Sequence, residues 1–176
     1  MKKLSMEELG RKTPEQFLKA DKFPLMIVLD NVRSMMNIGS VFRTADAFLL
    51  EGILLCGITA TPPHREIHKT ALGATDTVHW KYYEDTLQAV GELKEQGYTV
   101  LALEQVAHSI DLASYEPEIG QKYALVFGNE VQGVQQQVVD QCHGCLEIPQ
   151  FGTKHSLNIS VSAGMVIWDF YSKLLK

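Results

Sequence analysis

The stretch LMIVLDNVRSMMNIGSVFRTADAFLLEGILLCG (residues 25–57) decides the fold class. Its two ends, 25–30 and 52–57, are apolar almost throughout, as strands are when both faces of a sheet are covered. Between them the apolar residues recur at the spacing of one helix face, at Ile38, Val41, Phe42, Ala45, Phe48 and Leu49. We expect this helix to be capped by Asn37. Strand, helix and strand in this order predict a parallel β-α-β unit.

The same alternation continues to the C-terminus. Further strands are predicted around 77–80 and at 98–104, 123–128 and 145–149, and further helices at 13–20, 65–72, 85–96 and in the apolar segment that ends the chain. The predicted fold is therefore α/β, a mostly parallel sheet with helices on both faces. No repeat, low-complexity tract or linker divides residues 1–176, so we expect a single domain with a short helical extension at 1–22.

Composition excludes several classes of protein. The chain has 176 residues and a net charge of −5, which argues against a surface that binds nucleic acid everywhere but leaves room for a local basic patch. No apolar run approaches the roughly 20 residues of a membrane span, and acidic residues follow the first lysines where a signal peptide would be apolar. We therefore expect a cytoplasmic protein that does not enter the membrane.

Cysteines indicate neither a disulfide framework nor a metal site. There are three, and an odd, low count does not suit a disulfide scaffold. The CHGC stretch places Cys142 and Cys145 at a spacing used for zinc or redox chemistry, but no second pair accompanies it. We interpret the two as small, partly buried residues and predict no metal.

Polar residues gather after the predicted strands, where ligands bind in sheets of this kind. Arg43 lies beside the apolar face of its helix, three residues before Asp46. It forms either an ordinary surface ion pair with Asp46 or a fork for a phosphate or carboxylate. The turn GNEVQG (128–133) follows a buried strand, and its glycines permit close approach of backbone to a ligand, although a plain strand-to-helix turn explains them equally well.

The third polar stretch, IPQFGTKHSLNIS (148–160), leads into the C-terminal helix. Ser156 is a plausible N-cap, and Asn158 would then lie in the first turn. Lys154 and His155 are cations just before a helix N-terminus, where the dipole disfavours them unless an anion is near. From Val161 to Phe170 the helix is apolar, and we expect its apolar side chains to be buried.

These three stretches, in this order, resemble the SpoU (TrmH-type) RNA 2′-O-ribose methyltransferases of the SPOUT superfamily. The first family motif, Asn-x-Gly followed by Arg-Thr-Ala, is matched by Asn37, Gly39, Arg43, Thr44 and Ala45. The second, Gly-x-Glu-x-x-Gly, is matched by Gly128, Glu130 and Gly133. The third is matched by Gly152, Ser156, Leu157, Asn158, Ser160 and Val161. The resemblance extends over about residues 25 to 172. Members of the family often carry an additional N-terminal RNA-binding domain, and we expect no separate RNA-binding domain here.

The resemblance implies a C-terminal segment threaded into a deep trefoil knot, a homodimer, and S-adenosyl-L-methionine as cofactor. It implies catalytic residues at Asn37, Arg43, Glu130, Ser156 and Asn158. It implies cofactor contacts at Leu103, Glu104, Gly128, Ile148 and Leu157. The expected substrate is a ribose 2′-hydroxyl of structured RNA, tRNA before rRNA, and the alternative is an RNA- or cofactor-binding module of the same fold without turnover.

Several roles stay open at this level. A guanidinium is a poor base because it stays charged in proteins. We therefore expect Arg43 to act as an electrostatic clamp, directed by Asn37 and Glu130, with proton acceptance by Ser156, a water or His155. Contacts to the RNA backbone are predicted at Arg33, Arg65, Lys69 and Lys154. The segment around Arg65 and Lys69 resembles a family segment but also suits a solvated helix face.

Overall fold

A parallel sheet of seven strands forms the centre of the computed structural model, which describes residues 1–5 and 7–175. The strands are β1 (Phe23–Asp30), β2 (Leu50–Cys56), β3 (Trp80–Tyr83), β4 (Tyr98–Leu103), β5 (Ile110–Asp111), β6 (Lys122–Phe127) and β7 (Gly144–Glu147). Their order is β3-β2-β1-β6-β4-β7-β5, and every neighbouring pair is parallel. The predicted α/β class is confirmed.

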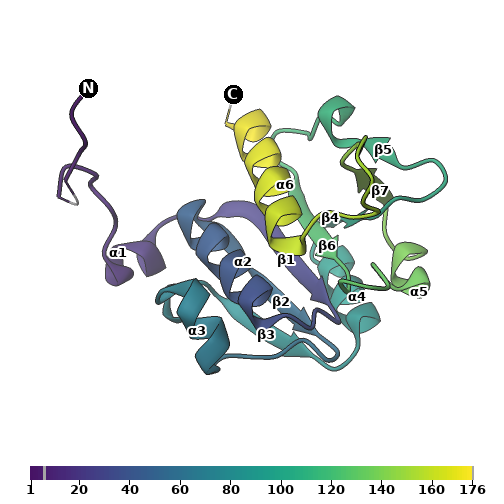
Figure 1. Ribbon diagram of the computed structural model, residues 1–176, viewed down its shortest axis with the longest axis horizontal. Helices are drawn as coiled ribbons and strands as arrows, with labels where there is room; N and C mark the ends of the chain where they lie inside the picture. Colours follow the sequence, from purple (N-terminus) through teal and green to yellow (C-terminus); the bar gives the residue numbers. More distant parts are fainter. Residues whose placement is uncertain (6, 176) are drawn as a thin grey trace.

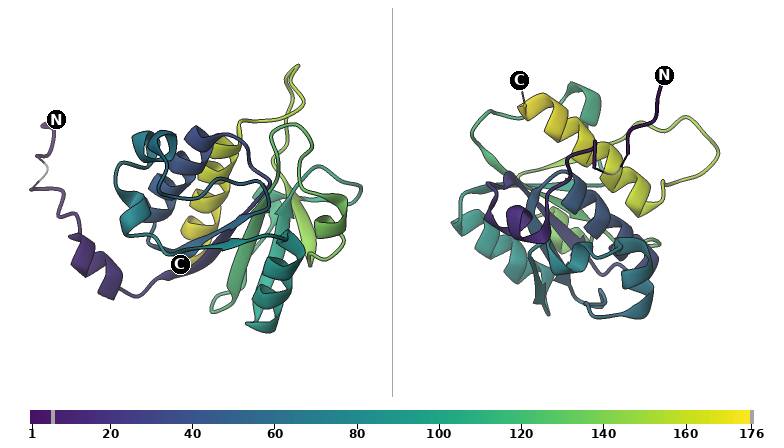
Figure 2. Two further views of the ribbon diagram at one scale, coloured as in Figure 1. Left: turned by 90° about the horizontal axis from the view of Figure 1, so that it is seen from below. Right: turned by 90° about the vertical axis from the view of Figure 1, so that its left-hand side faces the viewer.

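Helices cover both faces of this sheet (Figure 1 and Figure 2). One face packs against α2 (Met35–Ala47), α3 (Arg65–Ala71) and α6 (Ile159–Leu174), and the other against α4 (Thr86–Glu95) and the short α5 (Gln136–Val139). In β1, Leu25, Ile27 and Leu29 belong to the first core and Met26 and Val28 to the second. Both sides of the strand are buried, which explains its unbroken apolar sequence.

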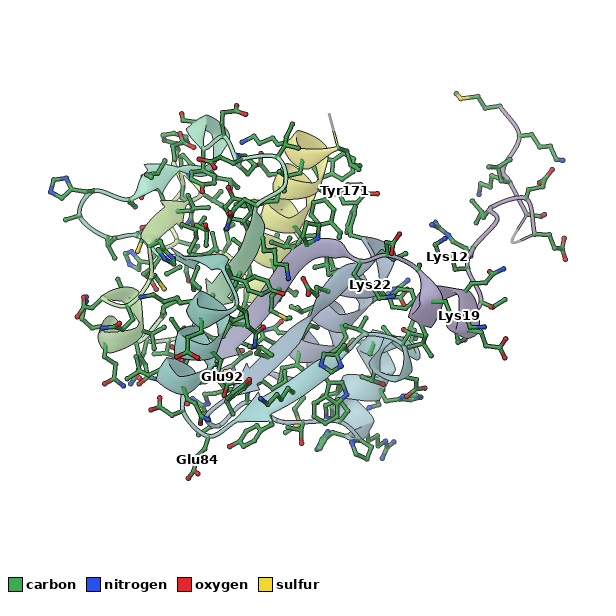
Figure 3. The ribbon with its side chains drawn as sticks, turned by 180° about the vertical axis from the view of Figure 1, so that it is seen from behind. Lys12, Lys19, Lys22, Glu84, Glu92 and Tyr171 are labelled. Carbon is green, nitrogen blue, oxygen red and sulfur yellow. The ribbon has the colours of Figure 1, made fainter. Side chains whose placement is uncertain are left out.

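The N-terminal helix α1 (Pro14–Lys19) has the predicted capping box, in which Thr13 and Gln16 exchange hydrogen bonds. Its one buried side chain is Phe17. Lys22 donates to the carbonyl oxygens of Phe17 and Ala20, and its ammonium lies 4.2 Å from the centre of the Phe17 ring. Figure 3 shows Lys12, Lys19 and Lys22 at this end of the molecule. Residues 1–5 and 7–13 extend away from the sheet (Figure 1).

Three predicted boundaries are wrong. Helix α2 is capped by Ser34, whose hydroxyl accepts the Asn37 N–H, so Asn37 is the third residue of the helix and not its cap. Helix α6 is capped by Asn158 and not by Ser156. The strand expected at 77–80 lies at 80–83. Two 3₁₀ turns, at 74–76 and 112–114, as well as β5 and α5, are too short for their periodicity to be recognised in the sequence.

Helix α6 is less buried than its sequence predicts. Ala163, Val166, Ile167 and Phe170 are fully buried. In contrast, Val161, Met165 and Trp168 are 47%, 47% and 58% exposed. Their spacing places them along one side of the helix, turned away from the sheet. The expectation that all apolar side chains of this helix are buried is therefore wrong for these three residues.

After β7, the chain returns to the face that carries α2 and ends as α6. Helices α2 and α6 lie side by side and run in the same direction, because Asn37 contacts Asn158 at one end and Phe48 packs on Trp168 at the other. The trefoil knot implied by the family resemblance stays a prediction. Within residues 1–5 and 7–175, no helix has the length and apolar character needed to cross a membrane.

Candidate active site

The loops at the carboxyl ends of β4, β6 and β7 enclose a pocket of about 470 Å³. That volume lies in the range of sites for small molecules and cofactors. Apolar side chains of Leu103, Leu146 and Ile148 meet polar groups of the 128–133 turn and of the segment that precedes α6. All five predicted cofactor residues line this pocket: Leu103, Glu104, Gly128, Ile148 and Leu157.

The turn after β6 is held by a pair of backbone hydrogen bonds. Asn129 and Gly133 each donate to the other's carbonyl oxygen at 2.9 Å. A Cβ on Gly128 would lie 2.0 Å from the Gly133 carbonyl carbon, so only glycine fits there. Gly133 itself has a φ of +70° and lies against the Glu104 carboxylate. The glycines therefore serve the turn itself, which brings backbone to the wall of the pocket.

Glu104 helps to hold this turn. Its carboxylate accepts the Val134 N–H at 2.9 Å and the Gln105 N–H at 3.0 Å. A second carboxylate, Asp30 at the end of β1, is completely buried and accepts hydrogen bonds from Asn31, Thr86 and Gln135. Sequence reasoning did not predict either anchoring role. The signal available was an acidic residue directly after a buried strand, which must find donors.

Glu130 joins the 128–133 turn to the start of α2. Its carboxylate accepts the N–H groups of Arg33 at 3.0 Å and Ser34 at 2.9 Å, and the side-chain amide of Asn37 at 3.2 Å. Partial burial opposes ionisation, but the hydrogen bonds from these donors outweigh it and hold the pKa of Glu130 below its ordinary value of 4.5. At neutral pH, Glu130 is an ionised anchor and a weak base.

Asn37 continues this network into α6. Its side-chain oxygen Oδ1 accepts a hydrogen bond from the side-chain amide of Asn158 at 3.1 Å, while Oδ1 of Asn158 caps α6 by accepting the Ser160 N–H at 2.9 Å. Asn37 is only 8% exposed. Three residues far apart in the sequence, Glu130, Asn37 and Asn158, therefore form one hydrogen-bonded chain beside the pocket.

Arg43 does not join that chain. It lies six residues after Asn37, so the two side chains leave α2 about 120° apart around the axis and about 9 Å apart along it. Asn37 and Glu130 bind each other, and the prediction that they direct Arg43 is not met. The alternative ion pair with Asp46 is also not among the ion pairs of the described residues, and Asp46 accepts instead from the Thr77 hydroxyl at 2.7 Å. Within the described part of the chain, the exposed Arg43 guanidinium has no hydrogen-bond partner.

The segment before α6 is exposed and forms the outer wall of the pocket. His155, Ser156 and Leu157 line the pocket, whereas Lys154 is exposed just before them. Ser156 does not cap α6 as predicted, because Asn158 is the N-cap residue. Its hydroxyl makes no hydrogen bond to the described residues and stays available to a ligand.

The four predicted RNA contacts fall into two places. Arg33 is exposed beside the Glu130 network, and Lys154 is exposed at the pocket rim. Arg65 and Lys69 lie on α3, which packs against the other side of α2. Lys69 forms an ion pair with Glu66 at 2.7 Å. The predicted RNA-contact set is therefore spread over two separate surfaces.

Burial raises the pKa of the Cys142 thiol to about 12, so this residue is neutral and a poor nucleophile near pH 7. Burial also raises the pKa of Cys145, and both cysteines are free. Within residues 1–5 and 7–175, no group of three or more His, Cys, Asp or Glu side chains could hold a metal ion.

The Glu130 network predicts a pH dependence of stability. Because its pKa is lowered on folding, Glu130 stabilises the fold fully above its unfolded value of 4.5, and this contribution is lost as the pH falls through the lower folded value. In the variant Glu130→Gln an amide –NH₂ must face an N–H donor, so we expect a lower melting temperature at pH 7. We also expect a smaller loss of stability in acid than in the wild type. Equal acid slopes in thermal melts of the two proteins would contradict this.

The fold and the pocket define an α/β protein that binds a ligand where loops meet at the carboxyl edge of a parallel sheet. More particularly, the chain belongs to the SpoU rRNA Methylase family, whose model matches residues 24–168. A 23S rRNA (guanosine-2′-O-)-methyltransferase RlmB of Neisseria meningitidis is 33% identical, over 82% of this chain and 56% of that protein.

Solved structures agree with this assignment. The AdoMet-bound rRNA methyltransferase from Sinorhizobium meliloti superposes with a TM-score of 0.81 at 26% identity, over 89% of this chain and 59% of that one. The TrmH/SpoU tRNA modifying enzyme of A. aeolicus has the same fold, with a TM-score of 0.78 at 24% identity, over 91% of this chain and 79% of that one. The chain spans between 56% and 64% of the length of the first curated relatives that it matches.

Proposed function

We propose that this protein transfers the methyl group of S-adenosylmethionine to a ribose 2′-hydroxyl of structured RNA, with tRNA favoured over rRNA. The observation that carries the proposal is the pocket beside the Glu130–Asn37–Asn158 chain in a member of the SpoU family. The relatives named for 2′-O-methylation and for AdoMet binding support it. The single-domain organisation and the cytoplasmic location expected from the sequence belong to the same proposal.

The pocket fits the cofactor in volume and in chemistry. Leu103, Leu146 and Ile148 offer an apolar wall for an adenine ring, and the exposed backbone of the 128–133 turn offers hydrogen bonds for its polar edge. Leu157 would cover the cofactor from the side of α6. When bound, S-adenosylmethionine supplies an electrophilic methyl group on a positively charged sulfur.

The protein's own residues would orient the ribose and stabilise charge. A 2′-hydroxyl is a poor nucleophile and must be held in line as its proton leaves. Arg43, which has no partner in the described part of the chain, would bind the adjacent phosphate or the developing alkoxide. The unpartnered Ser156 hydroxyl at the pocket wall would contact the 2′-hydroxyl. The hydrogen-bonded chain of Glu130, Asn37 and Asn158 would hold the 128–133 turn, α2 and α6 in fixed positions relative to one another.

A homodimer would complete this site. The exposed side chains of Val161, Met165 and Trp168 form an apolar stripe on α6, and Arg43 lies at the level of this stripe because α2 and α6 run side by side. Apolar stripes of this kind mark protein contacts. We infer that a second copy docks there and presents its own groups to Arg43 and to the RNA.

Met165→Glu tests this interface. We expect it to convert a dimer into a monomer in size-exclusion chromatography with light scattering, because a charge would have to be buried between subunits. The fold should persist, since the side chain is half exposed in the single chain. Leu18→Glu places the same charge on an exposed apolar residue of α1 and should leave the dimer intact. A wild type that is monomeric at all concentrations would contradict the proposal.

The function is tested by incubating the protein with methyl-labelled S-adenosylmethionine and separate pools of tRNA and rRNA. The expected result is label in one pool, with tRNA preferred. Cofactor binding measured by calorimetry without label transfer to either pool would favour the alternative, a binding module without turnover.

A further inference from the structure

A second cavity, of about 600 Å³, lies on α3, away from the cofactor pocket. We call it the α3 pocket and define it by Pro63, His64, Arg65, His68, Asp76 and Trp80. It shares no residue with the cofactor pocket. The residues of the α3 pocket have no role in the methyl transfer proposed above.

The walls of the α3 pocket are flat and rigid. Trp80 begins β3 and packs partly against the main core, so its indole is fixed in place. The His64 ring is fixed by its Nδ1, which accepts the Glu66 N–H at 3.2 Å. Pro63 adds a third rigid surface. Aromatic and proline surfaces of this kind stack on flat rings.

Hydrogen-bonding groups around these walls are free. The Trp80 indole N–H, the Arg65 guanidinium and the His68 ring make no hydrogen bond or ion pair within residues 1–5 and 7–175. Because Nδ1 of His64 is an acceptor, its neutral ring carries the hydrogen on Nε2, which is also without a partner there. By contrast, the neighbouring Lys69 is neutralised by Glu66.

The pocket also has a charged acceptor, the exposed Asp76 carboxylate, whose one hydrogen bond from the described residues comes from the Thr75 hydroxyl at 3.4 Å. Stacking walls, an unpaired guanidinium and a carboxylate suit one ligand chemistry. A base can stack between the walls, a carboxylate can accept from its amino group, and an arginine can bind the attached phosphate. A bare phosphate would not use the walls, and a purely apolar ligand would not use the donors.

Helix α3 packs directly against the N-terminal part of α2 and is hydrogen-bonded to it. Thr70 donates to the Met36 carbonyl oxygen at 3.0 Å, and a Cβ on Gly39 would lie 2.3 Å from the Ile67 carbonyl oxygen. Met36 and Gly39 flank Asn37, which belongs to the Glu130 network. An RNA strand held on α3 is therefore held at a fixed position relative to the proposed reaction site.

We propose that the α3 pocket binds an unstacked nucleotide of the substrate RNA, a nucleotide other than the one that is methylated. This rests on the proposed function, since it takes RNA as the substrate. It implies that the recognised RNA includes a single-stranded loop or end, because a paired base cannot enter such a pocket.

The experiment uses the full-length chain without cofactor, so it does not depend on methyl transfer. In a Trp168→Phe background the tryptophan emission, excited selectively over tyrosine, comes from Trp80 alone, since the chain has two tryptophans. A single-stranded RNA hexamer should quench this emission saturably, and a blunt RNA duplex should not. A mononucleotide should bind more weakly than the hexamer.

Variants assign the binding to named groups, with a dye-labelled hexamer followed by anisotropy. Arg65→Ala and Trp80→Leu should each weaken binding about tenfold, and Trp80→Phe should restore it because it keeps a stacking ring. Lys122→Ala removes an exposed cation at the start of β6, outside the pocket, and should change little.

The proposal is overturned if the hexamer does not quench Trp80, if duplex and hexamer quench equally, if the mononucleotide binds more tightly than the hexamer, or if Lys122→Ala weakens binding as much as Arg65→Ala. Absence of methyl transfer by the wild type would count against the proposed function alone and would leave the hexamer result standing.

Discussion

Replacing Arg43 with alanine is expected to lower methyl transfer by about 100- to 1,000-fold, the usual effect of removing a group that stabilises developing charge. Folding and cofactor binding should be unchanged. The side chain is exposed, has no partner in the described part of the chain, and does not line the cofactor pocket. The measurement combines single-turnover transfer to the methylated RNA pool with calorimetric binding of S-adenosylmethionine.

Arg11→Ala is the matched control, because it removes an exposed arginine ahead of α1 and should retain the wild-type rate. A rate for Arg43→Ala within about threefold of the wild type would exclude the clamp role, since electrostatic stabilisation of a transition state is worth far more than that. Loss of cofactor binding in this variant would show instead that Arg43 acts on the pocket.

Gly128→Ala is expected to weaken cofactor binding by about 100-fold or more, which corresponds to about 2.8 kcal/mol. The new Cβ would lie 2.0 Å from the Gly133 carbonyl carbon and 2.1 Å from the Val134 nitrogen. Both are backbone atoms, so no side chain can move aside. The 128–133 turn must open, and Glu130 then loses its position against Arg33 and Ser34.

Gly91→Ala makes the same chemical change on α4, where an added Cβ meets nothing within 4 Å. It should bind cofactor like the wild type and melt at the same or a higher temperature, because alanine favours a helix. Calorimetry and thermal melts compare the two variants. Tight binding by Gly128→Ala would mean that the turn does not form the pocket wall.

Residues 25–57 could be interpreted correctly from sequence because each strand is buried on both faces, as the division of Leu25 and Met26 between two cores shows. The order of the strands could not be predicted, since it depends on contacts between distant segments. The predicted helix caps were wrong for a related reason. Ser34 and Asn37 are both good caps, and so are Ser156 and Asn158, and the choice depends on tertiary partners.

Gly128 and Leu157 were predictable as pocket residues because the family motifs carry them. Leu103, Glu104 and Ile148 are in no quoted motif, but they lie at the carboxyl ends of predicted strands, where ligands bind in such sheets. The hydrogen bonds that link the residues of the site could not be predicted. Nothing local in the sequence links Glu130 to the Ser34 N–H or Asn37 to Asn158, which are 96 and 121 positions apart. The stripe of Val161, Met165 and Trp168 was wrongly expected in the core, because an apolar residue on an exposed side of a helix looks the same in sequence as one that is buried.

The most direct test of the proposed function is to identify the methylated atom. The protein is incubated with methyl-labelled S-adenosylmethionine and total RNA, the RNA is digested to nucleosides, and these are analysed by mass spectrometry. The proposal predicts label in 2′-O-methylnucleosides, lost when Arg43→Ala replaces the wild type. Label on a base, or no label in RNA although the cofactor binds, would contradict it.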